Sequence, residues 1–161
     1  MNKVIKLFLK ESIKLELNIS DLYQLFSAKF RQDYNFWWKL SIEEMNHAAL
    51  IESINDLFLS ENIMPSASIE FKARELREMN LFIVQRIEEF RAGSPARADA
   101  FRLACEIEHS IGESHFELFM TSQANSTVMK IMQKLNGDDV SHGKRLAKYM
   151  TDNNIELKSQ E

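Results

Sequence analysis

Hydrophobic residues recur at steps of three and four along five long segments of the chain, which is the spacing of one face of an α-helix. The five segments are about residues 3–30, 33–59, 69–90, 96–122 and 127–153. Short polar breaks separate them, and these breaks contain Pro65, Gly93 and the pair Ser94-Pro95. Gly93 is a typical helix stop, and a serine followed by a proline is a typical helix start. The pattern predicts an all-α protein with five helices.

The lengths of the breaks predict how these helices connect. The first and second segments are joined by a short break, as are the fourth and fifth, so each pair is expected to form an antiparallel hairpin. The third segment carries the chain from one hairpin to the other. A four-helix bundle with one long crossover connection has this connectivity, and ferritin-like folds are the best-known example. We therefore expect one domain over residues 1–161, a ferritin-like four-helix bundle with a long helical crossover.

Four of the apolar stripes carry an acidic residue near their middle, where a core helix ordinarily has another hydrophobic residue. On the second and fifth segments a histidine follows one turn later on the same face. The six polar positions are Glu16, Glu44, His47, Glu108, Asp139 and His142. The two halves of the chain also repeat each other in spacing. A shift of 92 places Glu16 on Glu108, and a shift of 95 places "EEMNH" on "DDVSH".

Burying four unpaired carboxylates would cost several kcal/mol for each ion. No lysine or arginine lies on the stripes to neutralise them. Two divalent metal ions would balance the four negative charges. A Glu from each of two helices, with a Glu-x-x-His pair from each of the other two, is the ligand set of di-iron and di-manganese carboxylate bundles. Carboxylate and imidazole ligands suit iron, with manganese as the alternative. The six residues are therefore predicted to bind two metal ions.

Composition excludes several other classes of protein. The net charge of −4 has both signs interspersed, which argues against nucleic-acid and anionic-membrane binding. The single cysteine, Cys105, excludes an internal disulfide framework, a zinc ribbon and a CxxC redox pair. No apolar run approaches the ~18–20 residues that span a bilayer, and the N-terminal residues do not resemble a signal peptide. We expect a cytoplasmic protein.

Four stretches, "LELNISDLYQLF", "EEMNHAAL", "ACEIEHSIGESHFELF" and "DDVSHGKRLAKY", resemble the helix motifs of the rubrerythrin-like branch of the ferritin superfamily. The resemblance implies that Glu16 and Glu108 are terminal ligands, one for each metal. It implies that Glu44 and Asp139 bridge the metals as the catalytic carboxylates, and that each metal has one imidazole ligand. It also implies reduction of peroxide or dioxygen at a di-iron centre, a role in oxidative stress, and a homodimer.

The chain departs from the family pattern at several points. It has no CxxC pair, so the rubredoxin-type domain is missing and a separate rubredoxin-like or reductase-like protein must donate electrons. Ile111 stands where rubrerythrins have an additional Glu, Asp139 replaces the usual Glu, and His115 replaces the usual Tyr. Two other functions stay open: a ferroxidase or iron-storage module, and a non-catalytic stress or sensor module stabilised by metal.

Overall fold

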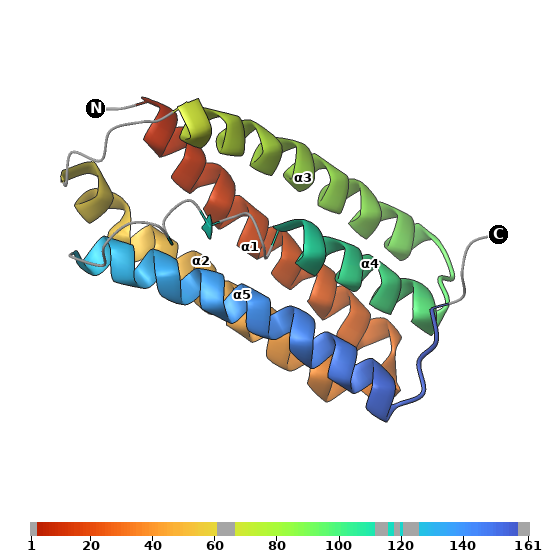
Figure 1. Cartoon of the computed structure of the whole chain (residues 1–161). Coiled ribbons are helices and arrows are strands. Elements are labelled where there is room, and N and C mark those ends of the chain that lie inside the picture. The colour runs from red at the N-terminus through yellow and green to blue at the C-terminus, as the bar shows by residue number, and fades with distance from the viewer. Residues whose placement is uncertain (1–2, 61–66, 112–115, 118–119, 121–125, 158–161) are drawn as a thin grey trace. The chain divides into compact units, whose positions relative to one another are not determined.

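The computed structural model describes residues 3–60, 67–111, 116–117, 120 and 126–157 (Figure 1). Within these ranges every regular element is helical and there is no strand, which confirms the all-α prediction. The elements are α1 (Lys3–Lys29), the 3-10 helix η1 (Arg31–Asp33), α2 (Tyr34–Ser60), α3 (Ala67–Ala92), α4 (Arg97–Ile111) and α5 (Thr127–Asp152).

Helix α4 is the one element whose predicted extent is wrong. The periodicity predicts a helix to about residue 122, but α4 ends at Ile111. Phe116, Glu117 and Met120 are not α-helical. The sequence continues after Ile111 with a glycine, which costs about 1 kcal/mol relative to alanine inside a helix. The apolar positions beyond it therefore follow a helical spacing without forming an α-helix at the three residues that are described.

The chain divides into two compact units, residues 1–93 and 94–161. In the first unit, α1 and α2 form an antiparallel hairpin through η1, as predicted, and α3 packs on α1 in the same direction (Figure 1). An aromatic cluster fills the base of the hairpin. The Phe26 ring lies 5.1 Å from the Trp37 ring and 5.0 Å from the Phe90 ring, measured between centroids, and so joins all three helices. Tyr23 lies 5.4 Å from Trp37.

Helix α3 is held on α1 by a narrow apolar stripe and one buried amide. The stripe is Ile69, Ala73, Leu76, Asn80, Ile83, Ile87 and Phe90. The Nδ2 of Asn80 donates to the Glu11 carboxylate and to the Glu11 carbonyl, each at 3.0 Å. The Oδ1 of Asn80 accepts from Asn18 Nδ2 at 2.8 Å. Because these buried groups pair only in one register, they specify how α3 aligns with α1.

The second unit consists mainly of α4 and α5, which pack antiparallel (Figure 1). Near the start of α4, the Asp99 carboxylate accepts from the Ala96 amide at 2.9 Å, as in a capping box. At the start of α5, the hydroxyl of Ser126 accepts from the Met129 amide at 3.2 Å. The Phe101 and Tyr149 rings stack between the two helices.

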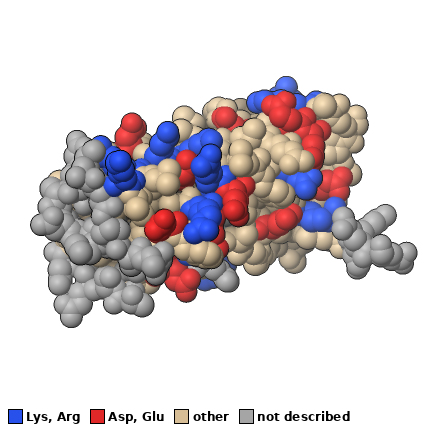
Figure 2. All heavy atoms as spheres, turned by 90° about the horizontal axis from the view of Figure 1, so that it is seen from above, with Lys and Arg blue, Asp and Glu red and all other residues tan. Residues whose placement is uncertain are grey.

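The surface carries charges of both signs, which lie side by side on the face shown in Figure 2. None of the helices in the described part of the chain has the length and apolar character needed to cross a membrane. The single domain and the ferritin-like arrangement of the two hairpins stay predictions.

Candidate metal site

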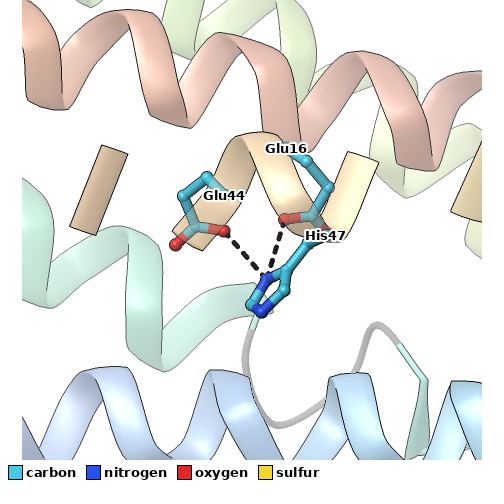
Figure 3. A group of neighbouring side chains, drawn as sticks. All are labelled: Glu16, Glu44 and His47. Carbon is cyan, nitrogen blue, oxygen red and sulfur yellow. Dashed lines mark hydrogen bonds and ion pairs between the residues drawn. The ribbon is translucent and has the colours of Figure 1, made fainter. Parts of the chain in front are cut away.

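Helices α1 and α2 bring three of the six predicted ligands together inside the first unit. Glu16 comes from α1, and Glu44 and His47 come from α2 (Figure 3). Their exposed fractions are 2%, 2% and 4%. One potential ligand atom from each residue lies within 4.8 Å of the other two. A buried group of two carboxylates and one imidazole is therefore present at the position that the stripes predict.

The two carboxylates converge on the same ring nitrogen. The Nδ1 of His47 lies 3.2 Å from Glu44 Oε2, which is hydrogen-bonding distance, and 3.7 Å from Glu16 Oε2 (Figure 3). Glu44 and His47 are three residues apart on α2, so they share a face of that helix. Glu16 reaches the same nitrogen from the neighbouring helix.

One buried hydrogen bond between the helices marks the register in which the two glutamates converge. The hydroxyl of Ser20 on α1 donates to the carbonyl of Ser41 on α2 at 2.9 Å, and both residues are buried. Ser20 lies one turn after Glu16, and Ser41 lies about one turn before Glu44. Because the two helices are antiparallel, this alignment brings the two glutamates to the same level of the hairpin.

Burial and mutual contact strongly perturb the proton affinity of this group. Desolvation raises the pKa of Glu16 from 4.5 to about 8, although the hydrogen bond with His47 opposes the shift. Burial by itself would lower the pKa of His47, but hydrogen bonds to Glu16 and Glu44 and their charges outweigh it and raise the pKa to about 11. Without a metal, Glu16 and His47 therefore stay protonated at neutral pH, whereas both side chains are mostly deprotonated at that pH in water.

This donor set fits a divalent metal ion. A cation placed between the carboxylates would supply the positive charge that protons otherwise provide, and it would require deprotonated ligands. Two carboxylates and one imidazole are hard to borderline donors, which suit iron or manganese better than a soft metal. The structure thus supports a possible metal site here, and it leaves the identity of the metal open.

The second unit holds two further predicted ligands close together. Potential ligand atoms of Glu108, on α4, and His142, on α5, lie within 4.8 Å of each other. His142 is buried, with 2% exposed, and Glu108 is half-buried. The two helices are in contact here, because a Cβ added at Gly143 would lie 3.9 Å from the Glu108 Cβ.

The remaining positions singled out in the second half are only partly described. Asp139 lies within α5, and Ile111 is the last residue of α4, but their side chains lie outside the description. His115 lies outside the described residues. Cys105 is half-buried, with its Sγ 3.6 Å from the Sδ of Met150. The bridging role predicted for Asp139 is therefore not tested.

Sequence reasoning missed a further buried acid in the first unit, Glu11. Glu11 is 7% exposed, and the buried amide of Asn80 holds its carboxylate. Asn80 interrupts the apolar stripe of the third segment, much as Glu16 interrupts that of the first, and this was the signal available in the sequence. The pair needs no metal, because an amide donor satisfies the carboxylate.

Comparison with known proteins adds no family. The chain matches no protein-family model, no curated protein and no solved structure. The resemblance to rubrerythrin-like proteins therefore rests on the four sequence motifs alone. What the structure establishes is an all-helical protein with buried carboxylate and histidine groups that could hold metal ions.

Proposed function

We propose that the protein is a di-iron carboxylate oxidoreductase that reduces peroxide or dioxygen with electrons from a separate donor protein. The observation that carries the proposal is the buried group of Glu16, Glu44 and His47, which has the donor atoms of half a di-iron centre. Such a group is costly to bury unless a cation or protons compensate its charge.

The second half of the centre is proposed from the repeat in the sequence. Glu108, Asp139 and His142 repeat the residue types and the spacing of the first three ligands. In the second unit, Glu108 and His142 lie close enough to share one metal ion. In the proposed centre, Glu16 and Glu108 would serve as terminal ligands, Glu44 and Asp139 as the carboxylates shared by the two metals, and His47 and His142 as one imidazole ligand each.

The proposed reaction is the reduction of peroxide at the two metal ions that the ligands would bind. Two ferrous ions held by these residues would supply the two electrons that, with two protons, reduce hydrogen peroxide to two water molecules. The side chains of this chain fix the ligand positions and exclude bulk water from the group. His47 and Glu16 hold protons in the metal-free state and must release them when metal binds.

Iron stoichiometry tests the proposal directly. The protein is loaded with Fe(II) without oxygen, desalted and analysed for iron. We expect two irons per chain in the wild type and a loss of at least one in Glu16→Gln. Glu11→Gln is the matched control, because Glu11 is also a buried glutamate of α1 but is held by Asn80. It should retain both irons.

The reaction is then followed in the loaded protein. Addition of one equivalent of peroxide should oxidise both irons rapidly, and a donor should allow further turnovers. Iron retention that is equal in wild type and Glu16→Gln, or absent from both, would exclude the di-iron assignment. Accumulation of many ferric ions per chain would instead indicate iron storage. Two retained irons that peroxide does not oxidise would indicate a structural metal.

A further inference from the structure

The outward face of the first half of α1 is unusually basic. Its exposed residues from position 3 to position 17 are Lys3, Lys6, Leu7, Lys10, Lys14 and Leu17. At about 100° of rotation per residue, all six fall within an arc of about 100°. We refer to these six residues as the lysine stripe. The next exposed residue on this face is Asp21, which ends it.

The positive charges of the stripe are uncompensated. Charged residues on the other helices form pairs along their own helix, such as Lys72 with Glu75 and Lys134 with Asp138. None of the four lysines has such a partner among the residues that the structure describes. The two acids in this part of α1, Glu11 and Glu16, are buried and lie outside the arc of the stripe. A chain with a net charge of −4 thus carries a local patch of four positive charges.

The layout of the stripe favours an acidic protein over the other anionic partners. Lys10, Lys3 and Lys14 lie at the centre of the arc, whereas a membrane-surface helix has its apolar residues at the centre. The two leucines lie toward its ends, Leu7 at one end and Leu17 next to Lys6 at the other. The stripe has no arginine and no aromatic residue, which are the usual means of holding nucleic acid. A lysine ammonium is a hydrated point charge that steers a partner without fixing it in a rigid geometry.

The position of the stripe suggests which acidic protein binds there. Glu16 lies on the buried side of the same helix, so a partner on the stripe would be separated from it by about one helix diameter, roughly 10 Å. The stripe is about 21 Å long, as expected from 1.5 Å per residue. A contact of this size belongs to the weak, short-lived class typical of electron-transfer partners.

We propose that the lysine stripe is the docking surface for an acidic electron-donor protein. This inference rests on the proposed function and names the partner that the function requires. For each peroxide reduced, two electrons leave reduced donor cofactors, one from each of two donor molecules when the cofactor carries a single electron, and these cofactors are oxidised. The peroxide takes these electrons with two protons and becomes two water molecules.

Binding is tested without any redox reaction. The probe is a zinc-substituted rubredoxin of acidic isoelectric point, titrated into the metal-free protein and followed by NMR or calorimetry. The test variant is Lys6→Glu/Lys10→Glu. The matched control is Lys39→Glu/Lys144→Glu, which makes the same change in net charge at two exposed lysines outside the stripe.

We expect the stripe variant to weaken binding at low salt by about tenfold or more, and the control by less than about threefold. Added salt should weaken wild-type binding and have a smaller effect on the stripe variant. The inference is overturned if the wild type does not bind the probe, if both variants weaken binding equally, or if salt has no effect. It is also overturned if phosphatidylglycerol vesicles or single-stranded DNA bind through the stripe and the rubredoxin does not.

The outcome is separable from the test of the proposed function. Iron loading of Lys6→Glu/Lys10→Glu should match the wild type, because neither lysine belongs to the buried group. If the chain binds the probe through the stripe but takes up no iron, the proposed function fails and the docking surface stands. If it loads two irons and peroxide oxidises them without any docking on the stripe, only the docking surface fails.

Discussion

The metal-free protein should lose stability as the pH rises through neutrality. Folding raises the pKa of Glu16 from 4.5 to about 8 and that of His47 from 6.5 to about 11. Both shifts mean that the folded chain binds more protons than the unfolded chain. The stabilisation from His47 is complete below about pH 6.5 and is lost as the pH approaches 11. Glu16 acts in the same direction, with the loss beginning above about pH 4.5 and ending above about pH 8.

The size of the effect follows from proton linkage. Each proton that the folded state keeps and the unfolded state releases lowers the unfolding free energy by about 1.4 kcal/mol per pH unit. Between pH 6.5 and 8, one retained proton predicts a loss of about 2 kcal/mol and two predict about 4 kcal/mol. Because Glu16 and His47 share a buried contact, the loss is a property of the group as a whole.

Urea unfolding of the metal-free protein at several pH values between 6 and 8.5 measures this slope. The control is Glu16→Gln/Glu44→Gln, in which His47 loses the carboxylates that raise its pKa, so the slope should flatten. Fe(II) bound without oxygen should stabilise the protein more at higher pH, since it competes with protons for the ligands. A wild-type stability that is constant or increases over this range would refute the assignment of retained protons to the group.

Three further predictions concern residues outside the Glu16–Glu44–His47 group. Asn80→Ala removes the donor that holds the buried Glu11 carboxylate, and it should lower the unfolding free energy by about 2–3 kcal/mol in urea titrations; a loss below about 0.5 kcal/mol would contradict this role. Ser126→Ala removes the N-cap of α5 and should cost about 1 kcal/mol, measured in the same way, whereas an unchanged midpoint would show that the cap contributes little. Burial and then the charge of Glu108 raise the pKa of the Cys105 thiol, so iodoacetamide should alkylate it faster in Glu108→Gln than in the wild type. Equal alkylation rates would exclude that electrostatic influence.

The local sequence pattern predicted the helices and the polar residues that lie on their inward faces. Glu44 and His47 share a face of α2 because residues three apart lie together on any α-helix, whatever it packs against. The burial of Glu16 follows from its place in an apolar stripe in the same way. The extent of α4 could not be read from periodicity, because apolar residues keep their helical spacing beyond Ile111. The helix nevertheless ends there, and the next residue is a glycine, which has a low helix propensity.

The sequence by itself thus determined that the chain is helical and that carboxylates and histidines lie on its inward faces. Only the tertiary structure decided that Glu16 meets His47, because their encounter depends on the register of α1 against α2, in which Ser20 bonds to Ser41. It also decided that Glu11 is held by Asn80, through the packing of α3 on α1. Helical periodicity is a short-range property of neighbouring residues, whereas register arises from contacts between residues distant in the chain. No local pattern encodes those contacts.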